Sequence, residues 1–412
     1  MTNINMENST RVVVTGIGTC SSLGHNVKET EESLNLSRVN FKDVPSFRFK
    51  TENPILRTKK CFMIPEDTSL DYKAQDLSIM YPMARDCIRQ AASSAKLNKT
   101  ILSKANTSFC IGMSVSTTFV RENVIYERFI NGNEAWDEIR YTTPILASKM
   151  AKEFGVNGII SVISTACASG TNSIGRAFDL IRSGRADYVI CGGIDIVSEL
   201  AFNGFNSLLA LSHSRCRPFG TDRDGMSLGD GCAMFILESY ESAQKRGADI
   251  YAEVKGYQIL NETYHPTSPH PEGIYALKCM KAALEMANLS INEVDYINAH
   301  GTGTKINDSS EFKAINNLLT NRTTPTFVNS TKGLTGHTLG AAGSMEALIC
   351  MLSMKNNTIY GDGRDYETLC SPKINYVKKN RYNIPVNVCV SNSFAFAGNM
   401  SSIILSKTED IN

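Results

Sequence analysis

Cys167 stands where a cysteine could act as a nucleophile. It follows the apolar, β-branched run 160–163 and lies in segment 165–170, in which every residue is small. Apolar residues then recur at helical spacing over 172–182, which places the cysteine at a strand-to-helix turn. Free N–H groups and the helix dipole favour a thiolate at such a turn. The pattern predicts a nucleophile that becomes acylated, although a free cysteine is more often a small buried hydrophobe.

Three further segments place reactive side chains directly after predicted strands, among residues too small to pack. His300 lies in an Ala-His-Gly-Thr-Gly-Thr loop, and Lys332 and His337 share the glycine-rich stretch 330–343. Residues 391–398 form a polar-to-aromatic turn. The chain has six histidines, and only these two lie in glycine-rich turns after strands. Glycines allow tight turns and close approach of a substrate, so these segments are candidate parts of one site.

A cysteine with one histidine is typical of a hydrolase or an acyl transferase. Two histidines indicate a further step, because neutral imidazole N–H groups can donate to a thioester carbonyl. Such a pair could stabilise the enolate that forms when a malonyl group loses CO2, and a lysine could orient one histidine. The set predicts a decarboxylative Claisen condensation in which Cys167 holds the growing acyl chain. A hydrolase is disfavoured because no water-activating carboxylate stands beside the thiol in the sequence.

The elements that must position these side chains alternate between strands and helices. Apolar runs predict strands at 11–18, 108–115, 158–166, 186–194, 232–239, 251–260, 294–299, 326–330, 387–393 and 401–405. Helical periodicity predicts helices at 78–95, 144–154, 172–182, 274–287, 309–319 and 339–354. This alternation indicates an α/β architecture with largely parallel sheets. The element order repeats, which predicts two similar halves, 1–248 and 249–412, joined near Gly247 without a linker.

Composition bounds the function class. The 412 residues are 42% hydrophobic and 20% charged with a formal net charge of +1, which argues against nucleic-acid and membrane partners. No apolar run approaches the roughly 18 residues of a membrane span, and no secretory signal is visible. The twelve cysteines include no C-x-x-C pair. We therefore expect a cytoplasmic protein with reduced thiols and no metal site.

The four segments, in their order and spacing, resemble the signature segments of the type II β-ketoacyl-acyl-carrier-protein synthases. Segments 217–225 and 228–231 match as well, so the resemblance covers residues 11–407. It implies the thiolase fold, with two αβαβα halves stacked as a five-layered sandwich, and a dimer. It also implies that acyl and malonyl groups arrive on the phosphopantetheine of an acyl carrier protein, with no bound cofactor.

The resemblance assigns a role to each matching position. Cys167 matches the nucleophile, His300 and His337 the decarboxylation and oxyanion pair, and Lys332 the supporting lysine. The backbone N–H groups of Cys167 and Phe396 match an oxyanion hole, and the Phe396 side chain matches an aromatic gate that admits malonyl after acylation.

Three acidic residues and two pocket residues complete the predicted site. Glu346 matches a carboxylate that braces the lysine, and Asp308 and Glu311 match structural acids beyond the first histidine. Met226 stands where the family usually has phenylalanine, which predicts a reshaped acyl pocket lined by Met226 and Phe205.

The gate and the carrier-docking region depart from the family pattern. Ala395 and Ala397 replace glycines, which predicts altered gate motion. Segment 71–76 contains one basic residue where the fatty-acid enzymes carry a basic cluster, and Leu209 stands where an arginine is expected. Carrier docking should therefore use other residues, for which the candidates are Arg57, Lys59 and Lys60, or a different carrier.

Segments 300–308 and 392–396 are closer to polyketide and polyene ketosynthases than to the fatty-acid enzymes. The resemblance thus favours a discrete type II polyketide or polyene ketosynthase. A housekeeping fatty-acid elongation synthase is the alternative. A non-condensing chain-length-factor-like subunit is a remote alternative, because such subunits usually lack the cysteine. The dimer partner is either a second copy or such a paralogue.

Overall fold

The computed structural model describes residues 10–45, 56–66, 79–132 and 142–408. Eleven strands form one mixed sheet in the order β11-β10-β9-β12-β13-β8-β1-β7-β6-β4-β5. The strands of the first half are β1 (Val12–Ser21), β4 (Thr107–Gly112), β5 (Ile160–Ile163), β6 (Tyr188–Asp195) and β7 (Gly231–Ser239). Those of the second are β8 (Ala252–Asn261), β9 (Tyr296–Asn298), β10 (Thr326–Asn329), β11 (Ile374–Tyr376), β12 (Val388–Phe394) and β13 (Asn399–Ser406).

The two half-sheets have the same topology. Outward from the centre, the first runs β1-β7-β6-β4-β5 and the second β8-β13-β12-β9-β10, with β11 as an additional edge strand. When β11 is left out, the strands follow the same order in both halves. In each half the two inner pairings are antiparallel and the two outer pairings parallel. The halves join where Val12–Val14 of β1 pairs antiparallel with Ala252–Val254 of β8. The duplication predicted from element order is confirmed at the level of strand topology.

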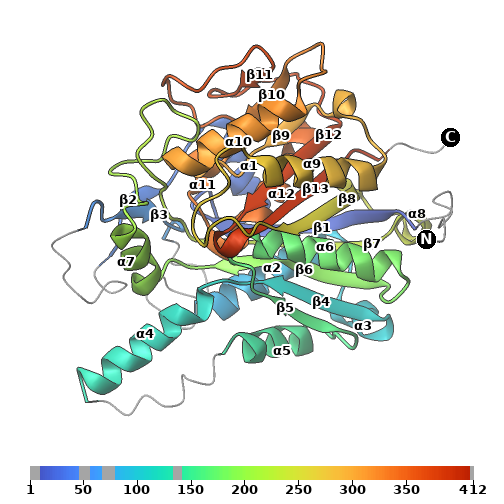
Figure 1. Cartoon of the computed structure of the whole chain (residues 1–412). Helices are drawn as coiled ribbons and strands as arrows, with labels where there is room; N and C mark the ends of the chain where they lie inside the picture. Colours follow the sequence, from blue (N-terminus) through green and yellow to red (C-terminus); the bar gives the residue numbers. More distant parts are fainter. Residues whose placement is uncertain (1–9, 46–55, 67–78, 133–141, 409–412) are drawn as a thin grey trace.

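Helices form three layers, one between the two half-sheets and one on the outer face of each (Figure 1). The helices are α1 (Val27–Asn35), α2 (Met80–Ser94), α3 (Lys99–Lys104), α4 (Ser116–Phe129), α5 (Thr143–Glu153), α6 (Ser169–Arg182), α7 (Glu199–Ser207), α8 (Tyr240–Arg246), α9 (Ile274–Ala287), α10 (Lys305–Leu318), α11 (Lys332–Thr335) and α12 (Ala342–Asn356). The outer layers are α2 and α5 against the first half-sheet and α9, flanked by α10, against the second. Helices α6 and α12 pack on each other and on strands of both halves, so the layers alternate as in the thiolase fold.

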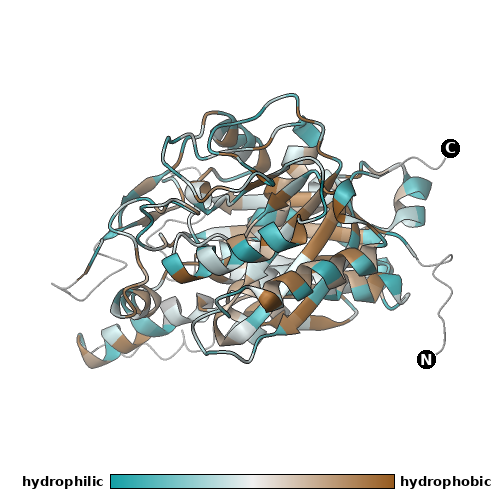
Figure 2. Ribbon diagram, turned by 45° about the horizontal axis from the view of Figure 1, so that its top comes forward, coloured by the Kyte–Doolittle hydropathy of each residue, from teal (hydrophilic) through white to brown (hydrophobic). Residues whose placement is uncertain are grey.

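The central helix α12 shows why the interior has this shape. Every residue from Ala342 to Met354 is buried, and a helix that is apolar on all sides must be surrounded by other elements. Figure 2 shows the strands as mostly hydrophobic and the outer helices as alternating between hydrophilic and hydrophobic residues. Within the described ranges, none of the helices combines the length and apolar character that crossing a membrane would require.

Several elements differ from the sequence prediction. Strand β5 ends at Ile163 rather than 166, because residues 166–168 form a 3-10 turn before α6. The prediction missed strand β11 and the hairpin of β2 (Phe41–Asp43) with β3 (Lys60–Phe62), and it missed helices α1, α3, α4, α7 and α11. Glu238, near the end of β7, is fully buried and pairs with Arg246 of α8, because a buried carboxylate requires hydrogen-bond donors.

Candidate active site

Cys167 lies on the 3-10 turn Ala166–Ala168, directly before α6. Ser169 Oγ shapes this turn, accepting from Thr165 N at 2.9 Å and donating to Ala166 O at 2.6 Å. Ala166 adopts φ +47°, a left-handed conformation that costs an L-residue about 1 kcal/mol or more. The strained turn leaves the Cys167 side chain only 8% exposed, on the wall of a cavity.

The thiol itself is protonated at rest, contrary to the thiolate that the helix terminus led us to expect. Burial raises the pKa of Cys167 to about 12, and the opposing charge of Lys332 does not offset it. Asp195 and Glu346 raise the pKa further. Desolvation disfavours the charged form of a group, and here it is the largest influence on the pKa of the thiol. Attack by Cys167 must therefore include loss of its proton.

His300 and His337 lie on loops that follow β9 and α11, and their ring centroids are 5.4 Å apart. Lys332 Nζ lies 3.2 Å from Nδ1 of His300, and the backbone N–H of Leu339 donates to Nδ1 of His337 at 3.1 Å. An Nδ1 atom that accepts a hydrogen bond leaves the proton of a neutral imidazole on Nε2. Both rings are thereby set as Nε2–H donors.

Both histidines stay neutral at neutral pH. Burial lowers the pKa of His300 and of His337 well below 6.5, and the positive charge of Lys332 lowers both further. Neutral imidazoles donate hydrogen bonds without carrying a charge into a dry site. The pair can therefore stabilise a developing oxyanion while remaining unprotonated themselves.

Lys332 and Glu346 form a buried ion pair behind His300, with side chains 1% and 2% exposed. Lys332 Nζ also donates to the carbonyl oxygen of His300 at 2.6 Å. A buried lysine that binds both the ring and the backbone of a histidine fixes that side chain in position. Burial raises the pKa of Glu346 to about 7, and Lys332 acts against this rise.

Asp308 and Glu311, both on α10, hold the His300 loop through hydrogen bonds to its backbone. Glu311 accepts from the backbone N–H groups of His300 and Gly301, each at 2.8 Å. Asp308 accepts from Gly303 N at 3.1 Å and from Phe219 N at 2.7 Å. Burial raises the pKa of Glu311 to about 7. Both acids thus bind backbone N–H groups of the loop that carries His300.

Phe396 lies at the start of the 3-10 turn Phe396–Gly398, with its ring centroid 5.7 Å from that of Phe205. Two backbone bonds tie this turn to the segment after β8: Ala397 N donates to Pro266 O at 2.7 Å and Glu262 N to Gly398 O at 2.7 Å. Ala397 adopts φ +62°, whereas Ala395 has φ −124°, an extended conformation open to any residue. Of the two alanine substitutions, only the one at 397 strains the backbone.

The predicted residues converge on one cavity of about 440 Å³. Cys167, His300, His337 and Phe396 line it, together with Phe205 and Met226. Lys332 and Glu346 lie behind His300, as described above. Met226 is 3% exposed and packs in an apolar cluster with Phe202 and Leu211. The cavity thus joins a polar reaction centre to an apolar wall, which suits an acyl thioester.

Sequence reasoning missed Asp195, which holds the two halves together at the site. This fully buried carboxylate at the end of β6 accepts from Gly340 N at 2.6 Å, Ser114 N at 3.0 Å and Val115 N at 3.1 Å. Gly340 belongs to the turn between His337 and α12, so Asp195 of the first half anchors a loop of the second. An aspartate at the end of an otherwise apolar strand could have identified this residue, but the prediction did not use that pattern.

Comparisons with known proteins identify the family of the chain. The model of the β-ketoacyl synthase N-terminal domain matches residues 9–243, and that of the β-ketoacyl synthase C-terminal domain matches 251–361. The 3-oxoacyl-[acyl-carrier-protein] synthase 2 of Staphylococcus aureus strain COL is 34% identical over 422 residues, covering 98% of this chain and 100% of that protein.

Two solved structures are similar over nearly the whole chain. The ishigamide ketosynthase/chain length factor superposes with a TM-score of 0.89 at 30% identity, covering 98% of this chain and 100% of that one. A type II polyketide synthase acyl-carrier protein in complex with its ketosynthase, bound to the hexaketide, gives 0.87 at 28% identity, with the same coverage. Fold and site define a thiolase-fold acyltransferase that forms carbon–carbon bonds. The chain belongs to the β-ketoacyl synthase family.

Proposed function

We propose that this chain is a β-ketoacyl-acyl-carrier-protein synthase in which Cys167 is the nucleophile. The observation that carries the proposal is the convergence of Cys167 with two neutral Nε2–H donors, His300 and His337, on one cavity. Acyl and malonyl groups are supplied as thioesters on the phosphopantetheine of an acyl carrier protein, and the protein itself needs no bound cofactor.

The first step is transfer of the acyl group to Cys167. The Sγ–acyl bond forms, the carrier thioester bond breaks, and the Cys167 proton ends on the released carrier thiol. The pKa of about 12 means that little thiolate exists before substrate binds. Backbone N–H groups of Cys167 and Phe396 form the oxyanion hole in this proposal, which the presence of both residues in the cavity lining supports.

The second step is decarboxylation of malonyl thioester and condensation. The bond to the carboxylate breaks, CO2 leaves, and the electron pair moves onto the thioester oxygen, where the two Nε2–H groups donate. The enolate carbon then attacks the acyl carbonyl on Cys167, and the Cys167–acyl bond breaks as the new carbon–carbon bond forms. The Cys167 thiolate that is released takes up one proton from solvent water. Lys332 positions His300 so that its Nε2–H faces the cavity.

Intact-mass spectrometry with acyl-carrier and malonyl-carrier substrates tests both steps. Cys167→Ala should take up no acyl group and form no condensation product. The exposed Cys370 provides the matched control, because Cys370→Ala should be acylated as the wild type is. Condensation by Cys167→Ala at the wild-type rate would contradict the proposal. A wild-type protein that takes up no acyl label would instead identify a chain-length-factor-like subunit.

We place the enzyme in a type II polyketide or polyene pathway. The support is the resemblance of segments 300–308 and 392–396 to polyketide and polyene ketosynthases, and the similarity to solved type II ketosynthase structures. The housekeeping alternative predicts a preference for saturated acyl chains. Comparing kcat/KM for a polyunsaturated and a saturated acyl-carrier substrate of equal length distinguishes the two. A higher value for the saturated chain would contradict the polyketide assignment.

The carrier protein docks at the cavity mouth in this proposal. Leu209 there is 70% exposed, and the guanidinium of Arg57 donates to its carbonyl oxygen at 2.6 Å. Arg57 therefore places a cation beside the position where the family pattern has an arginine, which suits an acidic carrier. Lys59 and Lys60 are exposed nearby in the chain, whereas segment 71–76 lies outside the described residues.

Charge reversal tests this docking site. Arg57→Glu should raise KM for an acyl-carrier substrate about tenfold or more and leave KM for the same acyl group on free pantetheine unchanged. Equal KM changes for both substrates would contradict docking at Arg57. Light scattering of the purified chain, alone and with a chain-length-factor-like paralogue, tests the proposed dimer and distinguishes a homodimer from a heterodimer.

A further inference from the structure

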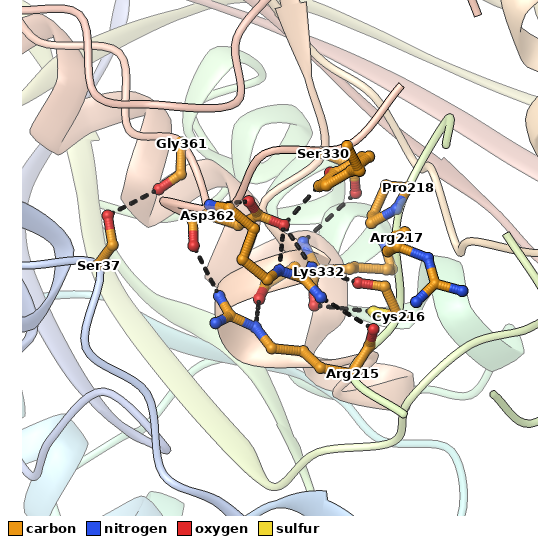
Figure 3. Close-up of polar contacts among 12 residues, drawn as sticks. Ser37, Arg215, Cys216, Arg217, Pro218, Ser330, Lys332, Gly361 and Asp362 are labelled. Atoms are coloured by element: carbon orange, nitrogen blue, oxygen red, sulfur yellow. Dashed lines mark hydrogen bonds and ion pairs between the residues drawn. The ribbon is translucent and has the colours of Figure 1, made fainter. Parts of the chain in front are cut away.

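The turn that carries Lys332 is held by two neighbouring residues of the first half. Arg215 Nε donates to the carbonyl oxygen of Gly333 at 2.7 Å, and Cys216 Sγ lies within hydrogen-bonding distance of the carbonyl oxygen of Lys332, at 3.3 Å. Figure 3 shows the Arg215 side chain between this turn and Asp362, whose carbonyl oxygen accepts from Arg215 Nη2 at 3.0 Å. The carbonyl groups of Lys332 and Gly333, at the start of α11, are thus both bound by residues of the first half.

A second arginine holds Arg215 in place. Arg364 Nη1 donates to the carbonyl oxygen of Arg215 at 2.9 Å, and Arg364 Nη2 to that of Cys216 at 2.5 Å. Arg364 is itself fixed by an ion pair with Asp362, whose side chain is only 4% exposed. A Cβ atom on Gly333 would lie 2.7 Å from Asp362 Oδ2, so this aspartate packs directly against the lysine turn.

The same stretch of the first half also reaches the second histidine. Cys216 N donates to Ser227 Oγ at 3.0 Å, and His337 N donates to the carbonyl oxygen of Ser227 at 2.7 Å. The segment between α7 and β7 therefore contacts the backbone of both Lys332 and His337. A shift of this segment would move two groups that the proposed decarboxylation uses.

We infer that Arg215 is a positioning residue for malonyl decarboxylation, acting through the backbone of the Lys332 turn. This inference rests on the proposed ketosynthase function. The rigid guanidinium fork bridges Gly333 and Asp362, which a flexible ammonium cannot do with the same two bonds. Without that bridge the Lys332 turn relaxes, and Nζ loses its 3.2 Å contact with Nδ1 of His300. A misplacement of about 1 Å can cost a hundredfold in rate.

The effect should be selective for one of the two chemical steps. Cys167 sits on a turn of the first half that Ser169 shapes, and Arg215 makes no contact there among those that the structure describes. Acyl transfer to Cys167 should therefore survive the loss of Arg215. Decarboxylation, which needs His300 in place, should not.

The experiment measures both steps in Arg215→Met and Arg215→Lys. Acylation of Cys167 is followed by intact mass, and malonyl-carrier decarboxylation by release of CO2. The matched control is Arg322→Met, which removes a buried arginine that likewise donates to backbone carbonyls, those of Ile291, Val294 and Thr324. The quantity compared is the decarboxylation rate divided by the acylation rate.

In Arg215→Met this ratio should fall at least about tenfold, and Arg215→Lys should restore part of it. Arg322→Met should lower thermal stability with the ratio unchanged. An unchanged ratio in Arg215→Met, or equal loss of both steps, overturns the inference. If Arg215→Met does not fold, the ratio in Arg215→Lys decides. A wild-type protein inactive in both steps would refute the proposed function instead.

Discussion

The two halves of the molecule share one topology but contribute different chemistry. After β5 the chain makes a short turn that presents Cys167 and then enters α6. After the corresponding β10, twelve residues precede α12, and they include Lys332 and His337. A short turn suffices to present one nucleophile at a helix start. A longer loop is needed to bury a lysine and aim an imidazole at the same cavity.

The other strand ends repeat this division. Residues after β4 bind Asp195, whereas His300 follows the corresponding β9. Strand β6 ends at Asp195, whereas the corresponding β12 leads into the turn at Phe396. Equivalent positions thus anchor the structure in the first half and line the cavity in the second. A duplicated scaffold can divide positioning from reaction because strand ends gather at one edge of each sheet.

Removing one histidine should have the largest effect, because it should slow condensation much more than acylation. We expect His300→Ala to lower condensation by about a thousandfold, because one of the two enolate donors is lost. Acylation of Cys167 should stay within about twofold of wild type, because neither the proposed nucleophile nor the proposed oxyanion hole includes His300. Single-turnover acylation and steady-state condensation measure the two effects. Equal loss of both steps would show that the halves do not act separately.

Removing the Asp195 carboxylate, which binds backbone groups of both halves, should have the next largest effect. Asp195→Ala removes an acceptor for three backbone N–H groups, two from the first half and one from the second. We expect the free energy of unfolding to fall by about 2–4 kcal/mol, because buried donors are left unsatisfied. Denaturant unfolding measures this loss. Asp195→Asn, which keeps the side-chain shape, should lose less, and an equal loss would contradict the hydrogen-bonding explanation.

The pH dependence of stability tests whether His337, in the second half, is held in its neutral form. The folded-state pKa of His337 lies well below 6.5, so its stability contribution is present above pH 6.5 and lost as pH falls. Relative to His337→Asn, the wild type should lose about 1.4 kcal/mol between pH 7.5 and pH 5.5. Unfolding at both values measures it. Glu311 and Glu346 are present in both proteins, so their effect on stability cancels in the comparison. A stability difference between wild type and His337→Asn that is the same at both pH values would indicate a normal pKa for His337.

The smallest effect compares two strained alanines, one in each half. Ala166 at φ +47° and Ala397 at φ +62° are both left-handed, beside the nucleophile and at the gate. Replacing either by glycine relieves the strain but adds freedom to the unfolded chain. We expect stabilities within about 1 kcal/mol of wild type and faster condensation only for Ala397→Gly. Faster condensation in Ala166→Gly as well would show that strain at the nucleophile also limits the rate.

Much of the fold and the reaction centre could be predicted because both depend on local pattern. Strand and helix periodicity identified the repeated halves, and small residues after strands marked Cys167, His300, Lys332 and His337. The protonation state of the thiol could not be predicted, because it depends on desolvation by residues distant in sequence. Asp195 and Arg215 were missed for the same reason, since each binds backbone groups more than a hundred residues later.

By itself, then, the sequence determined the topology of the two halves and the identity of the reactive side chains, because periodicity and turn composition act over a few residues. Only the tertiary structure decided how those side chains behave. It buries Cys167 so that the thiol is neutral, and it sets both imidazoles as Nε2–H donors through Lys332 and a backbone N–H. Burial depends on the packing of segments that are distant in sequence, and so does the contact of Lys332 with His300.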